Sequence, residues 1–191
     1  MNETSTEPRV LIVDDEAEVA DVYALRLRDD YDAVTAYGGE EALDAVDETV
    51  DVVLLDRRMP QVSGDEVLST IRDRGLDTRV IMITAVDPDF DIVDMPFDDY
   101  LCKPVQKEDL VAAIEQQLAA SRYDDRLTEY LEVTSKIALL EAEKTETELD
   151  ASDEVTGLRQ RAEQLRVEMD DALSEFDDFE AAFNEISRHA E

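Results

Sequence analysis

Short apolar runs alternate with amphipathic segments over the first 120 residues of the chain. Five runs have the length and composition of buried strands, namely residues 9–13, 31–36, 50–55, 79–84 and 100–103. Between them, apolar residues recur every three or four positions, which predicts helices at 16–29, after Gly38 and Gly39, at 64–75 and at 107–120. Continuous apolar strands separated by helices are typical of a parallel sheet covered on both faces. The expected fold is therefore α/β, with a doubly wound five-stranded parallel sheet.

The pattern changes after residue 120, where the strands stop and a longer helical period begins. A first helix is marked by Tyr123, Leu127, Tyr130, Ile137 and Leu140, and residues 146–157 hold the expected turn, with Ser152 as a candidate N-cap. A heptad seam follows at Val155, Leu158, Ala162, Leu165, Met169, Ala172, Phe176, Phe179, Phe183 and Ile186. Two helices joined by a short turn predict a C-terminal helical hairpin or coiled coil. Its seam is expected to be buried on itself or on a second copy of the chain.

Polar residues stand where the predicted strands end. Asp14 and Asp15 follow the first strand, Asp56 ends the third, Thr84 ends the fourth and Lys103 closes the fifth. Ligands of open parallel sheets bind beyond the carboxyl ends of the strands, so these side chains are expected to meet at one edge. Three carboxylates brought together repel one another unless a cation lies among them, and their oxygens suit Mg²⁺. Asp56 could then attack phosphorus as a nucleophile, with Lys103 and Thr84 contacting the transferred oxygens.

The stretches VDDE, LLDRRMP, ITA and YLCKP, in this order, resemble the receiver domain of two-component response regulators over residues 8–120. The resemblance implies a flavodoxin-like fold in which Asp56 accepts a phosphoryl group from a histidine kinase, and Lys103 pairs with that group. It implies a Mg²⁺ site made of Asp14, Asp15, Asp56 and the backbone carbonyl of Arg58. Thr84 and Tyr100 would act as switch residues. Such a protein is a phosphoacceptor that catalyses only its own phosphorylation and dephosphorylation, and not an enzyme acting on a separate substrate.

One segment departs from the receiver pattern. The span between Thr84 and Lys103 is short and contains Pro88 and Pro96, and a proline in a helix interior costs about 3 kcal/mol. The fourth receiver helix is therefore expected to be short, shifted or lost. Because that helix belongs to the output face in the family, dimerisation through this surface is not expected.

Residues 121–190 resemble the HalX domain that follows receivers in haloarchaeal regulators, which implies a transcription-related output module. The three phenylalanines of the seam favour a partner, such as a second copy in a homodimer. DNA binding is not favoured, because residues 121–191 carry 21 acidic and 8 basic residues, a net charge of -13. The group of Arg159, Arg161 and Arg166 is interleaved with Glu163 and Glu168, as on a solvated, ion-paired helix face.

The charge balance restricts the setting in which the chain works. Fifty-one acidic against 18 basic residues give a formal charge of -33, which favours a halophile with molar salt in its cytoplasm over a mesophilic acidic protein. No apolar run approaches the ~20 residues of a membrane span, so a cytoplasmic protein is expected. One cysteine and one histidine exclude a zinc cluster of the usual kind.

Two other functions compete with the phosphoacceptor switch. A phosphatase of the haloacid-dehalogenase type needs a second aspartate two residues after the first, but Arg58 follows Asp56 and Glu16 follows Asp14 at that spacing. A receiver-like interaction module without phosphate turnover is the alternative that remains. The complete set of polar strand-end residues counts against it.

Overall fold

The computed structural model describes residues 7–85 and 90–187, and the side chains of all of these except 90, 91 and 175–187. The chain divides into two compact units, residues 1–118 and 119–191. The first unit has five strands: β1 (Arg9–Val13), β2 (Asp32–Ala36), β3 (Val52–Asp56), β4 (Arg79–Thr84) and β5 (Asp99–Cys102). Its helical elements are α1 (Ala17–Leu27), α2 (Gly39–Ala45), α3 (Gly64–Asp73), the short 3-10 helix η1 (Phe90–Asp94) and the start of α4 (Lys107–Glu143).

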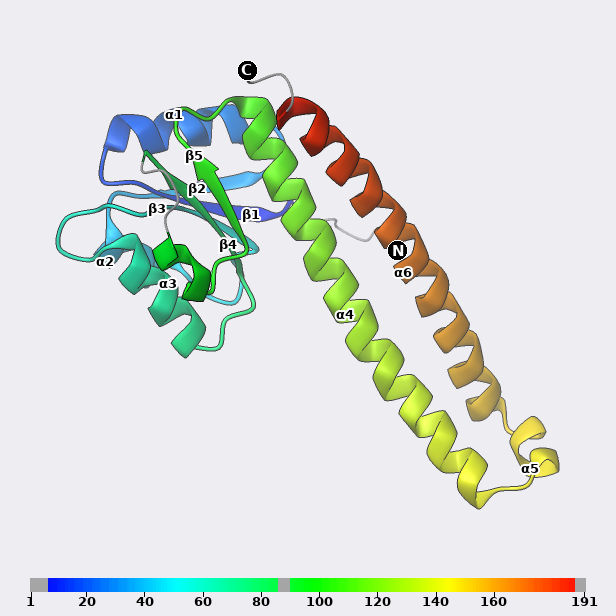
Figure 1. The fold of residues 1–191 in the computed structure, drawn as a ribbon. Helices are drawn as coiled ribbons and strands as arrows, with labels where there is room; N and C mark the ends of the chain where they lie inside the picture. The colour runs from blue at the N-terminus through cyan, green and yellow to red at the C-terminus, as the bar shows by residue number, and fades with distance from the viewer. Residues whose placement is uncertain (1–6, 86–89, 188–191) are drawn as a thin grey trace. The chain divides into compact units, whose positions relative to one another are not determined.

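All five strands are parallel and lie in the order β2-β1-β3-β4-β5, with helices on both faces (Figure 1). Alternate residues of each strand point to opposite faces. Val10 and Ile12 of β1 therefore pack with α1 and the start of α4, whereas Leu11 and Val13 pack with α2 and α3. This is the doubly wound sheet that the sequence predicts.

The region of the expected fourth helix holds only η1, which is five residues long. For the described residues this confirms a shortened helix, while Pro88 lies in the segment outside them. An ion-paired cluster fixes the chain that leads from η1 into β5. Arg72 of α3 donates to the Pro96 and Thr78 carbonyls and to Asp98, and Asp98 also accepts from the Val80 amide.

The expected end of a helix at Ala120 is wrong, because α4 runs on without a break to Glu143. Neither proline nor glycine occurs between Pro104 and Thr145, so nothing in the backbone forces the helix to stop. A proline or glycine would be needed to end the helix at residue 120. The change of apolar pattern there alters only what the helix packs against.

In the second unit, α4 is followed by α5 (Glu146–Asp150) and α6 (Asp153–Ser187), and Figure 1 shows α4 and α6 side by side in opposite directions. The hydroxyl of Ser152 accepts a hydrogen bond from the Val155 amide at 3.3 Å, which confirms Ser152 as the cap of α6. The buried residues of this unit include Val133, Leu149, Val155, Leu165, Met169 and Ala172. The hairpin thus closes within one chain over its described side chains, whereas the seam residues from Phe176 to Ile186 lie outside them.

Within residues 7–85 and 90–187, no helix combines the length and the hydropathy that a membrane crossing requires.

Candidate functional site

The carboxyl ends of β1, β3, β4 and β5 bring the predicted polar residues to one edge of the sheet. Register sets their positions: Val13 lies opposite Leu55, Asp56 opposite Ile83, and Thr84 opposite Cys102. Asp14 and Lys103 each follow the last residue of a strand. Because the strands are parallel, their ends coincide, and the side chains converge there.

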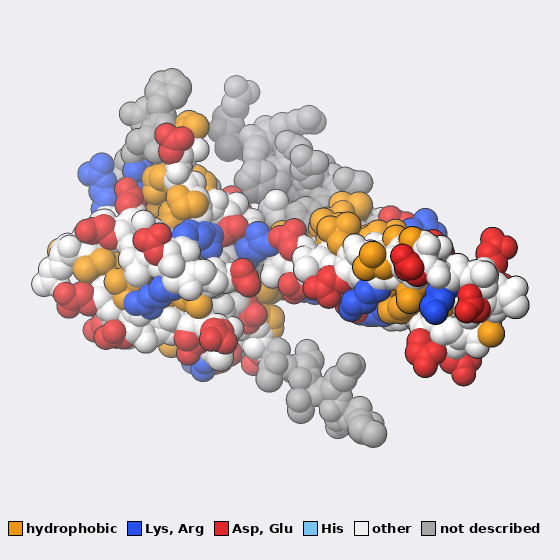
Figure 2. All heavy atoms as spheres, turned by 90° about the horizontal axis from the view of Figure 1, so that it is seen from below, with side chains coloured by type: hydrophobic (Ala, Val, Ile, Leu, Met, Phe, Trp, Pro, Cys, Tyr) orange, Lys and Arg blue, Asp and Glu red, His pale blue; other side chains and the backbone are white. Residues whose placement is uncertain are grey.

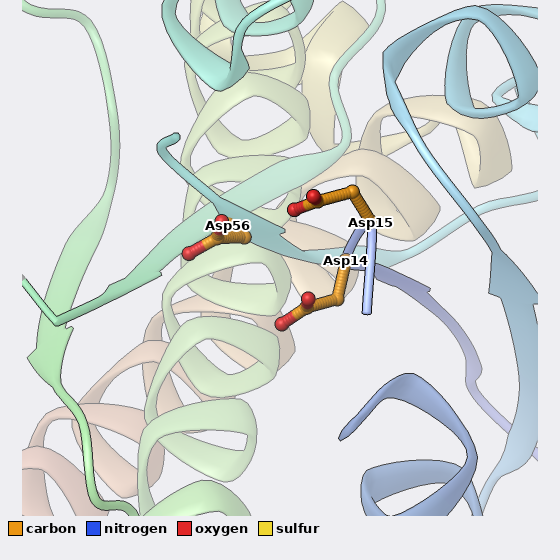
Figure 3. A group of neighbouring side chains, drawn as sticks. All are labelled: Asp14, Asp15 and Asp56. Atoms are coloured by element: carbon orange, nitrogen blue, oxygen red, sulfur yellow. The ribbon is translucent and has the colours of Figure 1, made fainter. Parts of the chain in front are cut away.

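Three carboxylates meet at this edge (Figure 3). One oxygen each of Asp14, Asp15 and Asp56 lies within 4.8 Å of the others. Asp14 and Asp56 are buried, with exposed fractions of 2% and 7%, while Asp15 is exposed. A set of carboxylate oxygens at this spacing, open to water on one side, fits a hydrated Mg²⁺ ion.

Lys103 bridges the two buried carboxylates. Its Nζ donates to Asp14 Oδ2 at 2.7 Å and lies 3.2 Å from Asp56 Oδ1. Burial works to lower the pKa of Lys103, but the hydrogen bond to Asp14 and the charge of Asp56 outweigh it and raise that pKa above its ordinary value. The Lys103 amide also donates to the Thr84 carbonyl at 2.8 Å, which fixes the end of β5 to the end of β4.

The pKa of Asp56 lies above the ordinary aspartate value. Burial is the largest cause, and the negative charge of Asp14 adds to it, whereas the Lys103 ammonium works in the opposite direction. A carboxylate in this condition gains from any additional cation, because the ion would favour its charged form. The raised pKa of Asp56 therefore agrees with a cation site among the three carboxylates.

Asp14 differs from its neighbours in being bound to protein atoms on both oxygens. Oδ1 accepts from the Glu16 amide at 2.9 Å at the beginning of α1, and Oδ2 accepts from Lys103. The Asp14 amide in turn donates to the Ala36 carbonyl. Asp14 thus holds the site together, and Asp15 and Asp56 are better placed to contact an ion directly.

The turn after Asp56 is held by Gly64 and by the capping pair of Ser63 and Glu66. The Gly64 amide donates to the Arg57 carbonyl at 2.9 Å, and a Cβ at Gly64 would collide with the Asp56 carbonyl oxygen. Ser63 and Glu66 then form a capping box at the start of α3. The pattern S-x-x-E at residues 63–66 was the signal available for this cap.

Two further predicted residues lie on β4 and β5. Thr84 is 1% exposed, at the end of β4. Tyr100 on β5 is half-buried, lies opposite Met82 and packs against the layer of α2 and α3, where its ring centre is 5.6 Å from that of Phe97. The side chain of Arg58 is exposed, two residues beyond Asp56.

Comparisons with known proteins agree with this architecture. The model of the response regulator receiver domain matches residues 10–115, and the model of the HalX domain matches residues 119–185. A Haloferax volcanii protein named "Putative transcriptional regulator" is 48% identical over 170 residues, which are 88% of this chain and 29% of that protein. The chain therefore spans less than a third of the length of this relative.

Solved structures match the first unit. A response regulator receiver domain from Clostridium thermocellum has a TM-score of 0.56 at 28% identity, covering 60% of this chain and 97% of that one. The response regulator TrrA from Thermotoga maritima, in complex with Mg²⁺-BeF, has a TM-score of 0.50 at 30% identity and covers 58% of this chain and 99% of that one.

Proposed function

We propose that this chain, which belongs to the response regulator receiver family and has a HalX domain after the receiver, is a phosphoacceptor switch in which Asp56 takes up a phosphoryl group. The observation that carries this proposal is the arrangement around Asp56. One half-buried lysine and two further carboxylates converge on a carboxylate that stands at the end of a fully buried strand.

The reaction uses groups of this chain at each point. An Asp56 carboxylate oxygen attacks the phosphorus atom, an O–P bond forms, and the bond from phosphorus to the donor's leaving atom breaks, with its electron pair going to the leaving group. For a phosphohistidine of a histidine kinase, the leaving group is the imidazole nitrogen. Mg²⁺, held by Asp15, Asp56 and the Arg58 carbonyl with help from Asp14, would supply positive charge to the transferred oxygens.

Lys103 has the second role. In the present geometry its ammonium is shared between Asp14 and Asp56. Once Asp56 is esterified, its charge moves outward onto the phosphoryl oxygens, and we expect the ammonium to follow it. Thr84 would donate its hydroxyl to the same group, and Tyr100 would then change its packing next to Phe97.

The HalX unit would carry the output, in transcriptional or signalling control as the name of the Haloferax volcanii relative suggests. Homodimerisation through the C-terminal helices fits this role better than DNA binding. Arg126, Arg159, Arg161 and Arg166 all pair with carboxylates of the same chain. Arginines engaged in this way are poorly available to neutralise DNA phosphates.

The experiment that tests the proposal is intact-mass measurement in concentrated KCl with Mg²⁺ and acetyl phosphate. We expect one phosphoryl adduct on the wild-type chain and none on Asp56→Asn. Asp15→Asn should keep its fold and bind Mg²⁺ at least about tenfold more weakly, since one ligand charge is lost. Absence of an adduct from the folded wild-type chain at any salt concentration would instead leave an interaction module without phosphate turnover.

A further inference from the structure

Phe97 is the aromatic neighbour of the predicted switch residue Tyr100. Their ring centres are 5.6 Å apart, the ring planes are inclined by 49°, and both side chains are half-buried in the layer of α2 and α3. Tilted aromatic pairs at this distance attract each other beyond what their buried area contributes. Any change in the packing of Tyr100 therefore acts on its contact with Phe97.

The backbone before β5 brings the two rings to the same face of the sheet. Phe97 and Tyr100 are three positions apart, so a continuous strand would direct them to opposite faces. Instead β5 begins at Asp99, and the chain bends at Asp98. Both rings then pack against the layer of α2 and α3. The contact between the rings therefore depends on the conformation of residues 96–98.

Arg72 of α3 holds this conformation on both sides of Phe97. Its Nε donates to the Pro96 carbonyl at 2.9 Å, and its Nη2 donates to Asp98 Oδ2 at 2.6 Å. Its Nη1 donates to the Thr78 carbonyl at 2.8 Å, so each nitrogen of the guanidinium has an acceptor. Figure 2 shows acidic side chains spread over the face that it draws, where salt screens their charges. The side chains of Arg72 and Asp98 are only 26% and 17% exposed, so salt screens this pair less.

Asp98 fixes the same segment to β4. Its Oδ2 also accepts from the Val80 amide at 2.7 Å, and its Oδ1 accepts from Arg79 Nη1 at 3.1 Å. The Asp98 amide donates to the Val80 carbonyl at 2.9 Å. The residues before and after Phe97 are therefore bound to α3 and β4, and these bonds place its ring beside Tyr100.

We propose that Phe97 is a second aromatic residue of the switch, which holds Tyr100 in the position that the structure shows, and that Arg72 positions Phe97. The assignment rests on the proposed function, in which Tyr100 changes its packing once Asp56 is phosphorylated. A contact made only before phosphorylation stabilises that state alone, so it lowers the affinity for a phosphoryl group by up to the same factor. Phe97 and Arg72 thereby set how readily the receiver reaches its phosphorylated conformation.

Affinity of the full chain for a phosphoryl analogue tests the assignment. The probe is beryllium fluoride with Mg²⁺, as in the TrrA complex from Thermotoga maritima, titrated in concentrated KCl. We expect Phe97→Leu to bind the probe about three times more tightly than wild type, because the aromatic pair is lost. Arg72→Gln should shift the affinity in the same direction. A purely structural role would lower the thermal midpoint without raising this affinity, and an affinity of either variant equal to or below that of wild type would overturn the role of that residue.

Two variants serve as matched controls. Leu43→Ala removes apolar contact from the same layer, but Leu43 lies on α2, which packs with β1 and β2, at the other end of the strand order from Tyr100. Arg74→Gln removes the same charge as Arg72→Gln two residues along the chain, where Arg74 donates to the Leu43 carbonyl at 2.7 Å. Both controls should bind the probe as wild type does. A gain in affinity in either one would overturn the assignment to Phe97 and Arg72.

A double substitution tests whether Phe97 acts through Tyr100. In a Tyr100→Leu background the contact between the rings is already lost, so Phe97→Leu should give no further gain in affinity for the probe. An undiminished gain would overturn the assignment. Intact mass after treatment with acetyl phosphate separates this question from the proposed function. An adduct on Asp56 together with an unchanged affinity of Phe97→Leu would overturn the role of Phe97 alone, whereas a folded wild-type chain with neither adduct nor probe binding would overturn both proposals.

Discussion

Charged side chains pair in both units of the chain, but in opposite surroundings. In the receiver, Asp14 and Asp56 are 2% and 7% exposed and share one lysine. In the helical hairpin, Arg161 and Glu129 form a bidentate pair whose side chains are 37% and 45% exposed. Buried charges are expensive to gather and strong in their effects, whereas exposed pairs contribute little and are screened by salt.

This difference distinguishes the buried charges of the candidate site from the exposed ion pairs of the helical hairpin. Around Asp56 the apolar sheet forces charges together, so adding or removing one charge alters the free energy of the unit. In the hairpin, stability comes from the buried line that includes Leu165 and Met169, and the ion pairs at its borders mainly set which faces meet. Substitutions in both units should show this difference, with effects that decrease from the buried hairpin core to the exposed ion pairs.

The largest effect is expected where the hairpin is apolar. Leu165 is completely buried, so Leu165→Ala should lower the free energy of unfolding of the hairpin by about 3 kcal/mol, through lost burial and the cavity left behind. Hydrogen exchange of the α6 amides in KCl measures this. Val167→Ala, at a position 49% exposed on the same helix, is the control and should change little. Equal losses for both variants would contradict a hairpin core at Leu165.

Two glycines give the next contrast. Gly64→Ala would place a methyl group against the Asp56 carbonyl oxygen and 2.8 Å from the Arg57 Cα, so it should cost about 2 kcal/mol and slow phosphorylation of Asp56. A Cβ at Gly157 in α6 meets nothing within 4 Å, so Gly157→Ala should stabilise the hairpin by about 0.5 kcal/mol. Thermal unfolding of both variants and the rate of acetyl phosphate uptake measure these effects. Loss of stability in Gly157→Ala would contradict the open space around this position of α6.

The receiver fold could be predicted because its signals are local. Each apolar run needed only its own residues to be recognised as a buried strand, and the parallel order brought Asp14, Asp56 and Lys103 to one edge. Pairing within that edge could not be predicted, since Asp14 and Lys103 are 89 residues apart in sequence. Which carboxylate oxygen accepts the hydrogen bond from the Lys103 ammonium depends on side-chain geometry in the folded chain.

Helix boundaries and helix faces were harder to predict. The apolar pattern changes at residue 120, yet α4 continues. The spacing of apolar residues shows which face of a helix is buried, but it does not show where the helix ends. The predicted stripe of the first helix is Tyr123, Leu127, Tyr130, Ile137 and Leu140, all of which are half-buried. The structure adds Val133, which is buried, and the ion pairs of Arg126 and Glu129 with α6. Which positions of α4 meet α6 depends on contacts between residues far apart in the sequence, such as Arg126 and Glu168, which are 42 residues apart, so no local signal gives it.

A smaller effect is expected from pH. The folded pKa of Asp56 lies above the ordinary aspartate value, so in the absence of metal its ionised form disfavours folding at neutral pH. Asp56→Asn should therefore be more stable than wild type in EDTA at neutral pH. This advantage should shrink as pH falls through the raised pKa of Asp56, because protonation then relieves the wild-type chain. Denaturant unfolding at several pH values measures the difference, and an advantage that stays constant with pH would contradict a buried, ionised Asp56.

The smallest effect is expected where the charges are exposed. Arg161→Gln removes the pairs to Glu129 and Glu168, both at the surface of the hairpin. Its thermal midpoint should fall slightly in dilute KCl and coincide with that of wild type in concentrated KCl, since salt screens exposed charges. Arg166→Gln, which loses only the local pair to Glu163 within α6, is the control for loss of a positive charge. If Arg161→Gln alone remained destabilised in concentrated KCl, these pairs would be structural in the same sense as Asp14 and Lys103, and the contrast between the two units would disappear.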